Sequence, residues 1–261
     1  MTPPLTPELV GAVVAVVFVA GAVNGVAGFG FAVVGTMALA TALEPATAVV
    51  FMILPVLGVN VSLAAELSSR QLRRCGRRFA PLLGAALVGT VVGLVLLRRV
   101  PTAPLRVGLG VVSLAFVATV QDAVALPTVG GSGESETAAS APAMAGIGAV
   151  SGLVFGGTNV GVQLVAYVRS FDLSHGLFVG VVAMVFLGLN AVRVVAAAVL
   201  GLYPSATVAV GSAVAAAPAL AGVAVGRRLR GLVSDRLREA VVLGLLTVVG
   251  VRLVLGGLGV A

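Results

Sequence analysis

A run of 35 consecutive uncharged residues, from Leu9 to Leu43, constrains the fold more than any other feature of the sequence. As one helix it would measure about 52 Å, whereas the hydrocarbon core of a bilayer is about 30 Å thick. Similar apolar segments fill most of the chain, in which 59% of the residues are hydrophobic and 10% are charged. A soluble domain has about 25% charged residues, so this chain cannot build a polar surface. The sequence predicts an all-α, multi-pass protein embedded in the lipid bilayer of the cell membrane.

About eight apolar segments are expected, arranged in two halves. Residues 1–126 form the first transmembrane repeat, 127–142 a flexible linker rich in Gly, Ser and Glu, and 143–261 the second transmembrane repeat. The expected segments are 9–43, 45–65, 79–97 and 102–120 in the first half, and 143–168, 174–200, 204–226 and 239–257 in the second.

The first segment of each half is interrupted by helix-breaking residues. In the first half the interruption reads Asn24 to Gly30, with three glycines, and in the second it reads Gly156 to Asn159. Glycine weakens a helix by about 1 kcal/mol relative to alanine. We therefore expect two shorter helices at each break, which form either a re-entrant hairpin or a discontinuous span.

The halves resemble each other in three places that occur in the same order, which predicts a duplication. The matching pairs are 22–25 with 149–152, 58–60 with 188–190, and 89–93 with 222–226.

Positive charge favours inverted copies. Five arginines lie in the segment Arg70–Arg78 and five more in Arg227–Arg238, and basic loops prefer the cytoplasm. Both segments are cytoplasmic if each interrupted segment enters and returns on the same side, which leaves three net crossings in each half and inverts the second copy. Arg98, Arg99 and Arg106 then lie on the outer side of the membrane, which departs from the preference of basic residues for the cytoplasm.

Paired breaks at corresponding positions indicate the binding site of a transporter, because helix N-termini attract anions. The alternative is that the glycines only permit close helix packing. Asn60 and Asn190 occupy matching positions and either line the pore or hydrogen-bond between helices. The candidate substrate-binding residues are Asn24, Gly28, Phe29, Gly30, Asn60, Gly156, Gly157, Thr158, Asn159, Gln163, Asn190 and Arg193.

Arg193 is the arginine placed well inside an apolar segment. A cation at this depth is expensive and usually functional, so we expect it to contact an anionic substrate. The alternative is that its side chain extends along the helix to the membrane surface near Leu200.

Other classes of function lack their signatures. The sequence contains no nucleophile elbow, Walker-type loop, metalloprotease motif or pair of intramembrane carboxylates, so we predict no enzyme, no cofactor and no metal site. The sixteen Lys and Arg residues are all arginines, and most of them cluster between apolar segments, which argues against nucleic acid as a partner. A monomer and a homo-oligomer are both compatible with the sequence.

The segment Ala20–Phe31 resembles the sulfite exporter TauE/SafE family of membrane permeases, and Gly188–Arg193 is similar to the asparagine and basic residue of that family's second half. The resemblance extends over essentially the whole chain. It implies export or uptake of small sulfur oxyanions, such as sulfite, or of organosulfonates, without ATP. The alternative is a non-transporting membrane scaffold or assembly subunit, which would need no polar, water-accessible midplane.

Overall fold

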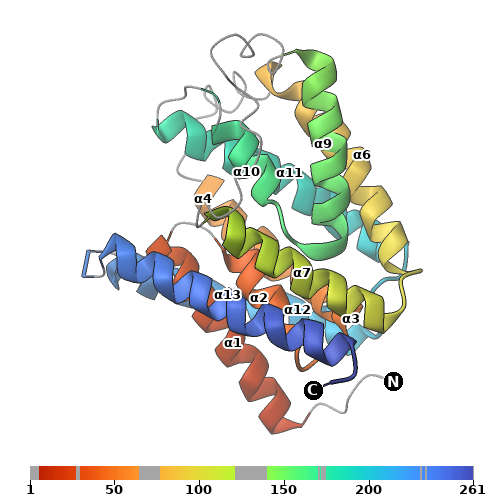
Figure 1. Ribbon diagram of the computed structural model, residues 1–261, viewed down its shortest axis with the longest axis vertical. Helices are drawn as coiled ribbons and strands as arrows, with labels where there is room; N and C mark the ends of the chain where they lie inside the picture. The colour runs from red at the N-terminus through yellow and green to blue at the C-terminus, as the bar shows by residue number, and fades with distance from the viewer. Residues whose placement is uncertain are drawn as a thin grey trace.

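The computed structural model describes residues 6–27, 30–64, 77–120, 140–169, 171, 175–229, 231–232 and 234–260. All regular structure in these ranges is helical (Figure 1). The helices are α1 (Pro7–Ala27), α2 (Phe31–Leu39), α3 (Pro45–Phe51), α4 (Ile53–Ala64), α6 (Ala80–Leu97), α7 (Thr102–Val120), α9 (Ala141–Thr158), α10 (Val162–Arg169), α11 (His175–Val199), α12 (Ala206–Leu229) and α13 (Asp235–Gly257).

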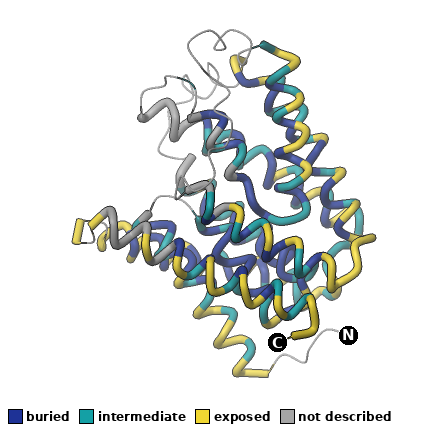
Figure 2. The backbone as a smooth tube through the Cα atoms, viewed as in Figure 1, coloured by how far each residue is buried: buried dark blue, intermediate teal, exposed yellow. Residues whose placement is uncertain are grey.

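Five helical stretches in the described ranges have the length and hydropathy needed to cross a membrane, namely Pro7–Val26, Pro45–Ser62, Ala80–Leu97, Ala141–Thr158 and Ala206–Leu229. They confirm the predicted polytopic, all-α membrane fold. Figure 2 shows exposed residues along the outer faces of the long helices, and many of these are valines, such as Val88, Val150 and Val214. Such apolar outer faces are suited to contact with lipid tails.

Local sequence sets several helix ends. The Glu44 carboxylate accepts hydrogen bonds from the backbone N–H groups of Ala46 and Thr47 at 3.3 and 2.9 Å, which caps α3 before its first residue, Pro45. Ser140 caps α9 in the same way. These side chains satisfy N–H groups that have no partner within the helix. The last residues of the predicted linker therefore belong to α9, and residues 121–139 lie outside the described part of the chain.

Both interrupted segments are present, and each break begins only at the C-terminal end of the predicted stretch. α1 continues through Asn24 and Gly25 to Ala27, and its 21 residues measure about 31 Å, which is enough to cross the bilayer. α9 likewise includes Gly156, Gly157 and Thr158. The expectation of two half-helices is therefore wrong for the first member of each pair, and only α2 and α10 are short. The glycines stay helical because neighbouring helices pack directly against them.

Helices from opposite halves form the closest pairs, which are α1 with α12, α6 with α9, and α7 with α13 (Figure 1). A side chain at Gly222 would clash with the carbonyl oxygen of Phe18 in α1, and one at Gly89 would clash with that of Ala149 in α9. Small residues at such interfaces let helix backbones approach closely, which supplies packing energy in a membrane.

The packing of these pairs supports the predicted duplication but shifts its register. Gly21 of α1 packs against Ala219 of α12, and Gly152 of α9 packs against Ala86 of α6. Ala86 and Ala219 are equivalent when 89–93 is matched with 222–226, so these contacts pair Gly21 with Gly152. The sequence match pairs Gly25 with Gly152 instead, and the two registers differ by one helical turn. Glycines repeated every four residues look alike after a shift of one turn, so sequence alone does not fix the register. The repeat itself stays a prediction.

Contacts along α12 fix the direction of its neighbours. The hydroxyl of Ser212 donates to the carbonyl of Phe51, and Gly58 lies beside Ala216. The residue numbers of the two contacts rise in the same direction in both segments, from Phe51 to Gly58 and from Ser212 to Ala216. The helices α3 and α4 therefore run parallel to α12. The segments that follow α4 and α12, which contain Arg70–Arg78 and Arg227–Arg238, therefore begin at the same end of the bundle. Residues 65–76 themselves lie outside the described residues.

A glycine-to-leucine pair tests the helix packing. We expect Gly222→Leu to destabilise the protein by about 1–3 kcal/mol or more, the usual cost of overpacking, because backbone atoms of α1 would obstruct the side chain. Gly84→Leu is the control, since nothing lies within 4 Å of a Cβ there. Thermal unfolding in detergent compares the two, and equal midpoints would show that the α1–α12 contact is dispensable.

Reporter fusions test the orientation. Reporters after Gly76 and Gly231 should both be cytoplasmic, because basic segments stay inside, while a reporter after Val100 should lie on the other side. Reporters at Gly76 and Gly231 on opposite sides of the membrane would contradict the inverted arrangement.

Candidate functional site

Asn159 fixes the second break against the first half of the protein. It ends α9 in the left-handed conformation, with φ of 63°, which asparagine adopts more readily than most residues. Its buried side-chain Nδ2 donates to the hydroxyl of Thr36 in α2 at 2.7 Å and to the carbonyl of Val49 in α3 at 3.0 Å. One side chain therefore joins the end of α9 to the α2–α3 hairpin.

The backbone at this break is largely satisfied by local groups. The Thr158 hydroxyl donates to the carbonyl of Val154 at 2.7 Å and accepts from the N–H of Val160 at 3.1 Å. Gly161 comes two residues after Asn159, at a position where a side chain would clash with the rings of Phe186 and Phe155. Irregular backbone at membrane depth is tolerated when protein surrounds it in this way.

Arg193 lies beside this break and is completely buried. Its Nη2 donates to the carbonyl of Gly156 at 3.4 Å, and its Cζ lies 4.9 Å from the centre of the Phe155 ring. Its Nε and Nη1 have no hydrogen-bond partner, and no carboxylate in the described ranges pairs with it. The side chain does not extend to the membrane surface, so that alternative explanation for Arg193 is wrong.

Three amide side chains near the same break also have unused acceptors. Asn190 is fully buried one turn before Arg193, and its Nδ2 donates to the carbonyl of Phe186 at 2.8 Å. The side-chain oxygens of Asn159, Asn190 and Gln163 are buried without partners. Each unsatisfied buried polar group costs about 1–3 kcal/mol, so several such groups around one break mark a place suited to polar ligands.

The first break contributes less to this cluster. The side-chain oxygen of Asn24 accepts from the N–H of Phe31 at 3.4 Å and so caps α2, while Gly30 has a φ of 98°. Gly28 and Phe29 lie outside the described residues, and Asn60 is half-buried on α4. No described contact brings the two breaks together, so their predicted shared cavity stays a prediction.

Several residues of the site escaped the sequence analysis. Thr36 is the one hydroxyl residue in the apolar helix α2, and that isolation was a usable signal. Phe155 and Phe186, whose ring centres lie 5.3 Å apart, look like ordinary apolar residues in the sequence. Their roles depend on the packing of α9 against α11.

Substitutions at Asn159 separate its backbone role from its hydrogen bonds. Asn159→Gly loses both hydrogen bonds, at about 1 kcal/mol each, but tolerates the positive φ. Asn159→Ala loses the same bonds and adds the strain of a left-handed residue, so it should be less stable than the glycine variant by about 1 kcal/mol. Thermal unfolding of the two variants measures the difference. An alanine variant as stable as the glycine variant would contradict this backbone role.

The family comparison agrees with this architecture. No curated protein and no solved structure matches the chain. The model of the sulfite exporter TauE/SafE family matches residues 13–253, from within α1 to the last turns of α13. The chain therefore belongs to the sulfite exporter TauE/SafE family.

Proposed function

We propose that this chain is a secondary transporter in the cell membrane that moves small sulfur oxyanions, most notably sulfite, or organosulfonates. Its family consists of membrane permeases and exporters of sulfur compounds, and the sequence carries no Walker-type nucleotide loop. The observation that carries the proposal is the buried, incompletely paired guanidinium of Arg193 beside the break between α9 and α10.

The surroundings of Arg193 compensate only part of its charge. A helix C-terminus carries about half a negative charge, and Arg193 reaches that of α9 through one hydrogen bond of 3.4 Å to Gly156, longer than the usual 2.9–3.0 Å. The Phe155 ring adds about 2 kcal/mol when such a contact is desolvated. Burying a charge costs several kcal/mol, so a positive charge and two donors are left for an anion.

The chemistry of a guanidinium suits an oxyanion. Arg193 is protonated at any physiological pH and presents N–H groups that match pairs of oxygen atoms. The unpartnered amide oxygens of Asn159, Asn190 and Gln163 accept hydrogen bonds from a protonated oxyanion or from water that accompanies it. Gly156, Gly157 and Thr158 place the end of α9 next to this cluster. In the first half, Asn24, Gly28, Phe29 and Gly30 form the corresponding break along the substrate path, and Asn60 on α4 is the counterpart of Asn190.

Substitutions of Arg193 test the function. Sulfite flux in proteoliposomes should fall about 10- to 100-fold in Arg193→Gln, because hydrogen bonds to a charged group contribute about 1.5–3 kcal/mol. Arg193→Lys should keep intermediate flux, since the charge is retained and the planar geometry is lost. Arg252→Gln is the matched control, because Arg252 is an exposed arginine on α13.

Stability measurements distinguish a functional arginine from a structural one. We expect Arg193→Met to unfold at the same temperature as the wild type or above it while losing flux, since replacing buried charge by an apolar side chain is often neutral or stabilising. Full sulfite flux in Arg193→Gln would refute the role of Arg193. A wild type that moves neither sulfite nor sulfonates would instead favour the scaffold.

A further inference from the structure

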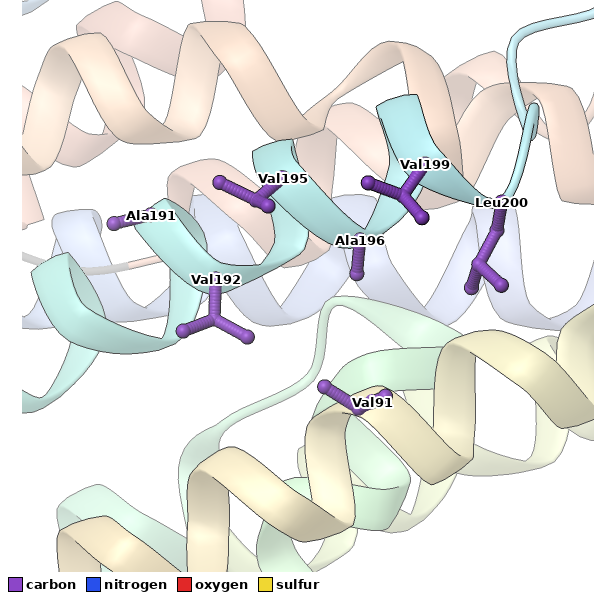
Figure 3. A pocket seen from close by; sticks show the side chains of 7 residues that line it. All are labelled: Val91, Ala191, Val192, Val195, Ala196, Val199 and Leu200. Carbon is purple, nitrogen blue, oxygen red and sulfur yellow. The ribbon is translucent and has the colours of Figure 1, made fainter.

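An open apolar cavity of about 500 Å³ lies between α6 and α11, and Arg193 is not among the residues that line it. In Figure 3 Val192, Ala196 and Leu200 point from α11 toward α6, and Val91 projects from α6 toward this space. The lining consists entirely of Ala, Val and Leu side chains, which are Val91, Ala191, Val192, Val195, Ala196, Val199 and Leu200. We call this cavity the α6–α11 groove.

The length of the groove matches one leaflet of a bilayer. From Ala191 to Leu200 the helix rises about 14 Å, close to half of the hydrocarbon thickness of about 30 Å. Val195 and Val199 are 63% and 80% exposed along it. A transmembrane helix, about 10 Å wide, would instead need a contact surface that spans both leaflets. The groove therefore suits a lipid tail from one leaflet.

The end of the groove is positively charged. A second cavity of about 210 Å³ is lined by Ala46, Val50, Leu97, Arg98, Gly201 and Leu202. Its Gly201 directly follows Leu200, which lines the groove. Arg98 and its neighbour Arg99 are exposed at the end of α6. In the described part of the chain, neither arginine forms an ion pair with a carboxylate. Glu44, next to Ala46, uses its carboxylate to cap α3.

We propose that the α6–α11 groove binds one anionic phospholipid, with an acyl chain along α11 and its phosphate against Arg98 and Arg99. A tail alone would explain the apolar lining but not the unpaired arginines, and a free anion would explain the arginines but not the groove. A phospholipid with net negative charge satisfies both.

The proposal also accounts for the position of these arginines. α6 begins at Ala80, just after Arg78, and ends at Leu97. Arg98 and Arg99 therefore lie at the end of the bundle opposite the segments Arg70–Arg78 and Arg227–Arg238. That end is the one where positive residues are disfavoured. A bound anionic headgroup compensates them there. The proposal is independent of the transported substrate, because Arg193 lies on the buried side of α11.

Lipid titrations of the purified protein in detergent test the site. Phosphatidylglycerol should raise the unfolding temperature and saturate, while phosphatidylcholine and glycerol phosphate should each give little or no shift. In Arg98→Gln/Arg99→Gln the half-saturating concentration should rise about tenfold or more, as expected for the loss of charged hydrogen bonds. Ala191→Phe, which fills the groove at an exposed alanine, should weaken binding similarly.

Arg252→Gln serves as the control, since it removes an exposed arginine from another helix and should bind phosphatidylglycerol like the wild type. Equal shifts with phosphatidylcholine, or unchanged binding in the double arginine variant, would overturn the proposal. A shift with glycerol phosphate alone would also overturn it, because the site would then recognise a free anion. None of these results depends on sulfite flux.

Discussion

Close backbone packing between helices of opposite halves is the interaction on which the rest of the structure depends. Lipid tails are as apolar as leucine, so helices in a membrane gain little from hiding apolar side chains and depend on direct packing. Gly222 against Phe18 and Gly89 against Ala149 provide that packing in two separate pairs. Each half thus completes the other, since the most extensive helix contacts among the described residues join the two halves.

This packing determines where each interrupted segment breaks. α1 and α9 stay helical through their glycines because α12 and α6 need those glycines for contact, and the break moves to the first residues beyond the contact. In α9 that residue is Asn159, whose amide reaches Thr36 and Val49 in the other half. The end of α9 is thereby buried, and its free carbonyl at Gly156 meets Arg193.

Local patterns predicted the helices well and their partners poorly. The segment 102–120 coincides with α7, because Pro101 precedes it and an uncharged run follows Arg106 up to Val120. The breaks occupy only the C-terminal ends of the predicted stretches, because tertiary contact outweighs the low helix propensity of Gly25 and Gly156. Asn159 and Arg193 could be selected as candidate site residues because they are polar residues in apolar segments. That Asn159 pairs with Thr36 and Arg193 with Phe155 could not be predicted, because those contacts join distant parts of the chain.

The two halves share a packing scheme but differ in charge, which agrees with the proposed binding of a single small anion. Asn60 and Asn190 occupy matching positions on α4 and α11, yet the residue three places later is Leu63 in one half and Arg193 in the other. A second arginine would add another desolvation cost of several kcal/mol and repel the first. One buried cation is enough to offset one anion in a low-dielectric site. If the proposed site binds a single oxyanion, one buried arginine is therefore the arrangement of least cost, because a second would add only desolvation and repulsion.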